Sequence, residues 1–449
     1  MRWLFILLIA ILAAGDILGK DMSLGPGLSP KNAVLYVIAL AMFFRIALAA
    51  TRPKQRLPML QVAFLVWIIY ATLSFATCVF IVHWTSYNIK ESGILLKAQL
   101  YDAALFCFTI FYAVENEADF KLLLRVLAGA IGISSILTLT DVVGVTHLGV
   151  RVGLVGAEAD RVFGMFGHAN ETGALLVCLL PAMMAVASAS RGPAKAWWYA
   201  CVLATLAVLV LTVSRGSYVA VVVGYSAAAF LCRRFLPLSK VFSWVLSGVT
   251  AAVVVSILVT LIVPNVGDVV MNRLLGTSTS LDMSEVSSGR TNIWANTLEH
   301  MIDTPVSFVS GFGWNVYDTR FIYATHNYYL DLWFNLGIIG LLAFVTILYQ
   351  TVKTAGAAAD LATPEVRPYM VALVFGVLGL AVNILFTNLS KPWPYIWMYV
   401  GMSLSVAAKV ISDASRKTAA EPTLVAASPG LPRAGPRPGV SGIPARGLH

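Results

Sequence analysis

Uninterrupted apolar runs of about twenty residues recur along the whole chain, and they restrict the possible folds more than any other feature. In lipid, only helices and closed barrels satisfy all of their backbone hydrogen bonds, and these runs lack the alternation of barrel strands. Hydrophobic residues make up 59% of the 449 residues and charged residues only 12%, which is more apolar surface than a water-soluble domain can bury. The sequence therefore predicts an all-α polytopic membrane protein.

The runs predict about twelve transmembrane helices, because each is close to the length that crosses the hydrocarbon core. They cover residues 3–18, 33–50, 58–82, 94–114, 122–140, 172–187, 197–211, 215–231, 241–263, 327–349, 369–388 and 393–409. The first run is similar to a cleaved signal peptide, but with so many spans behind it we expect an uncleaved helix.

Lysine and arginine are concentrated in alternate loops between the predicted spans, and this bias sets the orientation. With a cytoplasmic N-terminus, the basic stretches TRPKQR (51–56), RGPAK (191–195) and RR (233–234) all lie inside. Both termini are then cytoplasmic, and the long loop 264–326 lies on the outer side. The net charge of +9 reflects this inside bias, so we expect membrane lipids and no nucleic acid as partners.

We expect the membrane domain to occupy residues 1–410, and residues 411–449 to form a disordered cytoplasmic tail rich in Pro, Gly and Ala. The five cysteines are odd in number, and no pair has metal-ligand spacing, so we interpret them as small apolar fillers of the spans. The sequence indicates no metal site and no cofactor. The cysteines are Cys78, Cys107, Cys178, Cys201 and Cys232.

The first unusual polar segment on the outer side is RVFGMFGHANETG (161–173). Asn170 is expected to cap the helix that starts at Thr172, with Arg161 and His168 preceding it. The glycines of this segment allow the backbone to approach a ligand closely. The alternative is an ordinary loop with a cap, which the segment by itself favours.

The second segment, LTVSRGSY (211–218), places a cation at a helix N-terminus. Ser214 is expected to cap the helix, which leaves Arg215 in the first turn, where the helix dipole disfavours positive charge. A bound anion would make this placement favourable, because it would accept hydrogen bonds from both the free N–H groups and the guanidinium. The alternative is an arginine that snorkels to lipid phosphate.

The third segment, SSGRTNIWANTLEHMIDTP (287–305), predicts an amphipathic helix near residues 289–303 with Trp294 on its apolar face. Ser288 is the expected cap, and Arg290 would occupy the first turn. A second arginine would thus lie at a helix N-terminus on the same side as Arg215. The alternative is a solvated arginine on a surface helix.

The fourth segment, THNYYLDLWFNLGIIGLL (325–342), puts a titratable side chain at the start of an apolar run. Thr325 is expected to cap this helix and His326 to be its first residue. Because the positive end of the helix dipole disfavours imidazolium, we expect a neutral His326 that can act as a general base. The alternative is an interfacial histidine among the tyrosines of a membrane belt.

Taken together, the four segments place Arg161, Arg215, Arg290 and His326 on one side of the membrane. Two arginines at helix N-termini suit a pyrophosphate, and a neutral base beside them suits a hydroxyl acceptor. The residues therefore predict a membrane-embedded transferase that uses a lipid pyrophosphate.

The ordered set FGHANETGALL, LTVSRGSYVAVVVG, SGRTNIW and THNYYLDLWFNLGIIGLLAF resembles the O-antigen ligase/polymerase family of bacterial membrane proteins, most closely over residues 160–345. The resemblance implies a glycosyltransferase-C-like helical fold in the inner membrane, with a long periplasmic loop and a periplasmic active site. By resemblance, Arg215 and Arg290 look like the pyrophosphate-binding arginines of the family, and His326 looks like its catalytic histidine. Further donor- or substrate-binding candidates are Arg161, His168, Asn170, Ser214, Asn327 and Tyr328.

The same resemblance implies a saccharide on undecaprenyl pyrophosphate as the donor and a sugar hydroxyl of the lipid A–core as the acceptor. We expect direct displacement with inversion, in which His326 takes the acceptor proton and the two arginines hold the leaving pyrophosphate. The acids on the outer side include one close pair, Glu158 and Asp160, but no DxD motif, so we expect arginines in place of a metal ion.

Two alternatives remain open. A polymerase of the same family would use the same donor but a lipid-linked repeat as acceptor. A flippase or transporter would be a non-enzyme with charges in the middle of its spans, whereas Arg45 and Lys97 lie near span ends. We favour the ligase because of the modest chain length and the single long outer loop at 264–326.

Overall fold

The structure is a computed structural model that describes residues 1–18, 25, 27–48, 57–146, 162–164, 168–236, 250, 254, 257 and 289–426, with side chains up to residue 417. The described residues form helices and no strands; isolated bridge residues are Gly25, Leu28 and Val162. The predicted all-α fold class is confirmed for this part of the chain.

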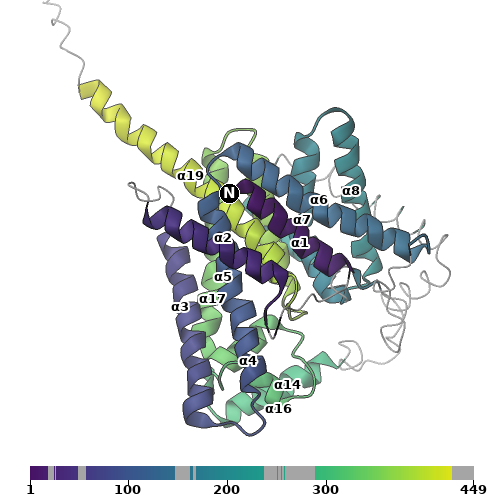
Figure 1. Cartoon of the computed structure of the whole chain (residues 1–449), viewed down its shortest axis with the longest axis vertical. Coiled ribbons are helices and arrows are strands. Elements are labelled where there is room, and N and C mark those ends of the chain that lie inside the picture. Colours follow the sequence, from purple (N-terminus) through teal and green to yellow (C-terminus); the bar gives the residue numbers. More distant parts are fainter. Residues whose placement is uncertain are drawn as a thin grey trace, which may run out of the picture.

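Most helices run through a bundle, and three lie at one of its ends (Figure 1). The bundle helices are α1 (Arg2–Leu18), α2 (Pro30–Ala47), α3 (Pro58–Thr77), α4 (Ile89–Leu96), α5 (Asp102–Ala113), α6 (Glu117–Val142), α7 (Ala169–Ala189), α8 (Gly192–Leu211), α9 (Arg215–Val219), α10 (Tyr225–Leu231), α17 (Tyr328–Leu361), α18 (Arg367–Asn383) and α19 (Trp393–Ala426). The π-helical turns η1 (Cys78–Val82), η2 (Lys97–Tyr101) and η5 (Ala220–Gly224) extend α3, join α4 to α5 and join α9 to α10. The end helices are α14 (Arg290–Asp303), α15 (Ser307–Ser310) and α16 (Tyr317–Arg320).

Eight described helical segments are long and apolar enough to cross a membrane, and two shorter apolar segments cover Arg215–Leu231 and Arg367–Asn383. The chain is therefore a multi-pass membrane protein. The span expected at 241–263 falls mostly outside the described residues, and α1 has 17 residues. The total of about twelve spans stays a prediction.

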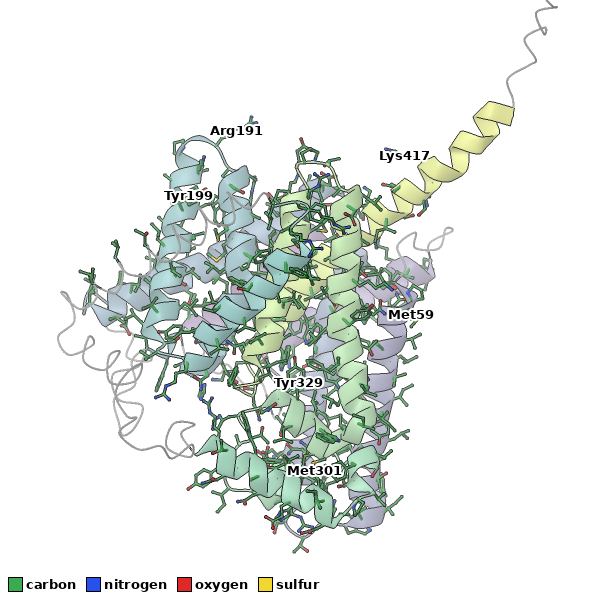
Figure 2. All side chains as sticks on the ribbon, turned by 180° about the vertical axis from the view of Figure 1, so that it is seen from behind. Met59, Arg191, Tyr199, Met301, Tyr329 and Lys417 are labelled. Atoms are coloured by element: carbon green, nitrogen blue, oxygen red, sulfur yellow. The ribbon has the colours of Figure 1, made fainter. Side chains whose placement is uncertain are left out.

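Ion pairs at one end of the bundle join segments that the lysine and arginine bias places on the same side. Arg45 in the last turn of α2 pairs with Glu115 after α5, and Arg234 after α10 pairs with Asp360 at the end of α17. Arg191 and Lys417 lie towards this end of the bundle, and Met301 of α14 lies at the opposite end (Figure 2). The expected alternation of segments between two ends is thus present in the fold. We call the end with these ion pairs the terminal end, and the opposite end, with Met301, the α14 end.

Reporter fusions test which end faces outward. We expect fusions after residue 276 and after His326 to report a periplasmic location, because the basic loops hold the other end inside. A fusion after Arg234 should report the cytoplasm, and so should one after Asp360, because these two residues pair. An inverted pattern would contradict the assignment of the α14 end to the periplasm.

Small residues let the central helices approach closely. A Cβ atom on Gly376 of α18 would lie 2.3 Å from the carbonyl oxygen of Cys178 on α7, and one on Gly401 of α19 would lie 2.2 Å from that of Cys107 on α5. Close backbone approach of this kind drives helix association in lipid, where the hydrophobic effect is absent. All five cysteines are free and buried, which agrees with their interpretation as apolar fillers.

Helix α17 is broken near its start, at Gly337, where φ is +61°. The chain between α15 and α16 binds the carbonyl groups that the break leaves open: the Phe312 N–H donates to Phe334 O (2.8 Å) and the Gly313 N–H to Asn335 O (3.0 Å). A broken membrane helix is stable only if its backbone groups are satisfied in this way. The break therefore fixes the first turns of α17 against the end helices.

The tail differs from its expectation over its first residues. Helix α19 continues past position 411, where we expected disorder to begin, and ends at Ala426. Residues 393–417 of this helix form one candidate span. The remainder of the tail, from residue 427, lies outside the described residues.

Candidate functional site

The N-terminus of α9 lies where three helices meet. Ser214 takes the expected cap position, but its side chain does not cap the helix; its Oγ instead accepts a hydrogen bond from Ser217 Oγ (3.0 Å). Asn383 Nδ2 of α18 donates to Ser217 Oγ (3.0 Å), and a Cβ on Gly173 of α7 would lie 2.3 Å from the same oxygen. The tight junction of α7, α9 and α18 therefore fixes Arg215, which is partly exposed in the first turn as predicted.

Helix α14 begins at Arg290, close to the expected position, and ends at Asp303. Its cap residue is Gly289, with φ of +79°, so the expectation of a Ser288 cap is wrong; a glycine reaches this left-handed conformation without strain. Burial lowers the pKa of the Arg290 guanidinium, and the nearby positive charge of Arg215 lowers it further. The positive charge of Arg215 therefore lies near enough to Arg290 to disfavour its protonated form.

Like charges that are partly buried together repel one another, so the proximity of Arg215 and Arg290 costs free energy in the folded state. An anion between them would reverse the sign of that interaction and would also meet the open N–H groups of two helix N-termini. A diphosphate, with oxygens on both phosphorus atoms, can accept bidentate hydrogen bonds from each guanidinium.

His326 lies before a helix and is not its first residue. Helix α17 starts at Tyr328 with Asn327 as its cap, whose Oδ1 accepts from the N–H groups of Tyr329 and Leu330 (3.1 Å each). The expected Thr325 cap is therefore wrong. His326 adopts the left-handed conformation with φ of +50°, which is uncommon for a residue other than glycine. Such conformations persist only where neighbouring contacts hold them.

Thr325 provides these contacts. It is fully buried; its Oγ1 donates to Asn388 Oδ1 (3.0 Å) and accepts from the Asn327 N–H (3.2 Å). Its carbonyl oxygen accepts a hydrogen bond from Trp294 Nε1 of α14 (2.8 Å). Helix α14 thus carries Arg290 at its start and holds the His326 turn one helical turn further on.

Two candidates next to His326 have structural roles. The Tyr328 ring is buried, with its centroid 5.2 Å from that of Phe344 and 5.3 Å from that of Trp393, and its N–H donates to Ile384 O (2.9 Å). Asn327 uses its side-chain oxygen as the helix cap. These contacts support the turn that carries His326. A substrate contact of Asn327 or Tyr328 stays a prediction.

The segment 161–173 is described only in part, and Arg161 lies outside the described residues. Helix α7 begins at Ala169 with His168 in the cap position, so the expected Asn170 cap is wrong, and Asn170 is a buried residue of the first turn. His168 Nδ1 is buried, and in the part of the chain that the structure describes it has no hydrogen-bond partner. His168 therefore remains a candidate ligand-binding residue.

The loop between α18 and α19 was missed by the sequence reasoning. Asn388 Oδ1 accepts a hydrogen bond from Thr325 Oγ1. The backbone N–H and the Oγ of Ser390 both donate to Oε1 of the buried Glu171 on α7 (2.8 and 2.7 Å). The loop thereby connects the α7 start to the His326 turn. The polar run TNLSK (387–391) between two apolar runs, on the predicted outer side, is the signal that would have revealed it.

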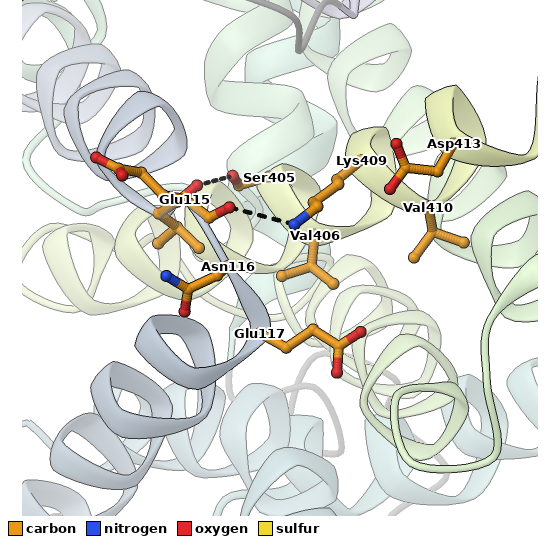
Figure 3. Close-up of a pocket in the computed structure, with 9 residues that line it drawn as sticks. Glu115, Asn116, Glu117, Ser405, Val406, Lys409, Val410 and Asp413 are labelled. Atoms are coloured by element: carbon orange, nitrogen blue, oxygen red, sulfur yellow. Dashed lines mark hydrogen bonds between the residues drawn. The ribbon is translucent and has the colours of Figure 1, made fainter. Parts of the chain in front are cut away.

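A small hollow at the terminal end does not belong to this site (Figure 3). Its volume of about 40 Å³ is close to that of a single water, and it lies between the α5–α6 turn and α19. Ser405 Oγ donates to Val114 O (3.0 Å) and Lys409 Nζ to Glu115 O (3.4 Å), so its polar groups hold α19 in place.

No group of three His, Cys, Asp or Glu side chains within the described ranges is arranged to hold a metal ion.

A comparison with models of protein families matches residues 200–345 to the family described as O-antigen ligase. The resemblance to the O-antigen ligase family is confirmed. The matched segment contains Arg215, Arg290 and His326, whereas the segment with His168 precedes it. A comparison with curated proteins finds no match to the chain. The O-antigen ligase match, together with the apolar helices, supports a multi-pass membrane enzyme of the glycosyltransferase kind.

Proposed function

We propose that the protein is an O-antigen ligase of the bacterial inner membrane. It transfers a saccharide chain from undecaprenyl pyrophosphate to a sugar hydroxyl of the lipid A–core, on the periplasmic side. The observation that carries the proposal is the hydrogen bond from Trp294 Nε1 to the Thr325 carbonyl oxygen (2.8 Å), which joins the helix that begins at Arg290 to the turn of His326. The charge of Arg215 lies near enough to Arg290 to lower its pKa.

In the proposed reaction, Arg215 and Arg290 bind the pyrophosphate of the donor. The acceptor hydroxyl attacks the anomeric carbon while the bond from that carbon to the phosphate oxygen breaks, so the configuration inverts. His326 takes the hydroxyl proton, and the electron pair of the broken bond leaves with undecaprenyl pyrophosphate. The two guanidiniums stabilise this growing negative charge and therefore act mainly on the transition state.

The fold supports this mechanism by holding the groups rigidly. Thr325 makes hydrogen bonds with both Asn388 and Trp294. Ser217, in the first turns of α9, accepts a hydrogen bond from Asn383 of α18, which fixes the start of α9. Because a displaced catalytic group loses much of its rate advantage, a site built on packed helix ends suits a base and an anion clamp. The break of α17 at Gly337 allows this helix end to meet the end helices.

We expect the reaction to proceed without a divalent metal ion. The leaving pyrophosphate is neutralised by fixed guanidiniums, so excess EDTA should leave transfer by the purified protein within about twofold of the untreated rate. Transfer is measured as the conversion of lipid A–core to a larger product on a gel. Loss of activity in EDTA with recovery on adding Mg²⁺ or Mn²⁺ would contradict the arginine mechanism.

A deletion strain separates the ligase from a polymerase of the same family. Without a ligase, we expect lipopolysaccharide with bare core on a gel, and full-length chains that accumulate on undecaprenyl pyrophosphate. Restoring the gene should return the chains to the core. Core that carries a single repeat, with no long chains on either lipid, would assign the protein as a polymerase and leave the donor site intact.

A further inference from the structure

A second hollow lies at the α14 end, between the end of α3 and the α14–α15 segment. It is a groove of about 490 Å³, open on one side, and is separate from the site around His326. Tyr70, Leu73 and Thr77 line it from one face of α3, at the spacing of successive helical turns. Phe312 and Phe334 close its inner wall. Arg215, Arg290 and His326 do not line this groove.

Polar and apolar side chains both line the groove, with Thr77, Asp303 and Arg320 among the polar ones and Val82 and Val306 among the apolar ones. The Arg320 guanidinium lies 4.5 Å from the centroid of the Trp84 ring, and no carboxylate of the described residues is within ion-pair distance of it. Asp303 and His300, from the last turn of α14, also line the groove. A cation with no carboxylate partner among the described residues, beside an acid and an imidazole, suits a ligand with both an anionic group and hydroxyl groups.

The rims of the groove are apolar and face outward. Leu73 on α3 is 60% exposed, and Val306 between α14 and α15 is 73% exposed. Phe80 and Ile81, just beyond α3, are also exposed. Helix α3 lies at one side of the bundle, with α14 and α16 near its lower end (Figure 1). In a membrane protein this combination is expected where acyl chains contact the protein beside the headgroup region.

Helix α14 connects the groove to the proposed catalytic site. It carries Arg290 at one end and Asp303 at the other, a distance of roughly 20 Å along its axis at the helical rise per residue. The polar side chains of Asn292, Asn296 and Glu299 are exposed along it. A ligand that occupies the groove and reaches His326 must therefore have a polar, extended part several sugars long.

We propose that this groove binds the phosphorylated, lipid-proximal end of the acceptor glycolipid, with its acyl chains along α3 and its phosphate on Arg320. This inference rests on the proposed function, because it assigns the acceptor to a place apart from the donor arginines. Asp303 and His300 accept hydrogen bonds from sugar hydroxyls, and the oligosaccharide follows α14 to His326. Bulk phospholipid fits the apolar walls but has no part that reaches the site of transfer.

The test uses the full chain in lipid nanodiscs and compares Arg320→Gln with Arg191→Gln, an exposed arginine at the terminal end. We expect Arg320→Gln to raise the KM for lipid A–core about tenfold, the effect of losing one charge-assisted contact. The KM for the donor and the kcat at saturating acceptor should match those of the control. With lipid A–core from which the phosphates have been removed, both variants should show the same raised KM.

A second variant, Thr77→Trp, fills the groove without changing charge and should also raise the KM for the acceptor. The proposal would be overturned if neither Arg320→Gln nor Thr77→Trp changed the KM for the acceptor. It would also be overturned if Arg320→Gln raised this KM by the same factor for phosphorylated and for dephosphorylated lipid A–core. Binding of lipid A–core to the intact protein, measured by native mass spectrometry, provides a readout independent of transfer. Phosphatidylethanolamine that displaces it at equal concentration would assign the groove to bulk lipid.

The two proposals fail in different ways. If the wild-type protein transfers nothing to lipid A–core but extends a lipid-linked repeat, the ligase assignment is wrong. Binding of lipid A–core that weakens in Arg320→Gln would then still support the groove. If transfer occurs but Arg320→Gln changes neither the binding of lipid A–core nor its KM, the groove assignment is wrong and the ligase assignment still stands.

Discussion

Replacing His326 by alanine is expected to reduce transfer by a factor of about 10² to 10⁴, the contribution of a general base. The acceptor hydroxyl would then have to lose its proton to water during the attack. Membrane abundance should remain near that of the wild type, because hydrogen bonds of Thr325 and Asn327 hold this turn. The measurement is the rate of transfer to lipid A–core by purified protein at equal protein concentration.

Two further variants separate the loss of a base from a change in the backbone. His326→Asn keeps a side chain that tolerates the left-handed conformation, so a loss as large as that in His326→Ala indicates missing proton transfer. His83→Ala is the matched control, because His83 is also a histidine in this conformation, with φ of +50°, near the same end of the bundle. Its activity should stay within about threefold of the wild type. Full activity in His326→Asn would exclude a role as base.

The variants Arg215→Lys and Arg290→Lys are each expected to lower kcat/KM for the donor by a factor of about 10² to 10³, although the charge is kept. A lysine places one compact ammonium where a planar guanidinium can donate two parallel hydrogen bonds to a phosphate. Because both arginines bind one pyrophosphate, the double variant should lose less than the product of the two single losses. Arg191→Lys, at the terminal end, should retain wild-type activity.

Stability gives an independent check on the same pair. Burial and the Arg215 charge lower the pKa of Arg290, so the protonated state is disfavoured by folding. A group whose folded pKa is below its unfolded value destabilises the fold at every pH below that folded pKa, which includes neutral pH. Arg290→Gln should therefore abolish transfer without lowering the thermal stability of the ligand-free protein. A clear fall in the thermal stability of Arg290→Gln would contradict a shared anion site. So would a loss of kcat/KM in the double lysine variant that equals the product of the two single losses.

The family match bears on the alternatives left open by the sequence. It covers residues 200–345 and supports an enzyme of the ligase/polymerase type rather than a transporter. Lys97, one of the few charges in a span, pairs with Asp102 (2.8 Å), five residues further along the chain, as a structural ion pair does. The choice between lipid-linked and core acceptors depends on the experiment with the deletion strain.

The sequence by itself determined the helical membrane class. It also indicated the orientation and the roles of Arg215, Arg290 and His326, which stay predictions. Long apolar runs and the motifs around Arg215, Arg290 and His326 are local properties, so they can be read without knowing what packs against them. The free cysteines and the helix near 289–303 followed from the same local patterns.

Only the tertiary structure decided where the helices near the site begin and what holds them. The residues in the cap positions differ from those expected, because a cap depends on backbone angles that distant contacts impose. Helix α14 has Gly289 in place of Ser288, α17 has Asn327 in place of Thr325, and α7 has His168 in place of Asn170. Trp294 and Asn388 hold Thr325 from two other parts of the chain. The apolar run through Gly337 is similar to a continuous helix in sequence, and its break is stable because Phe312 and Gly313 supply the missing hydrogen bonds.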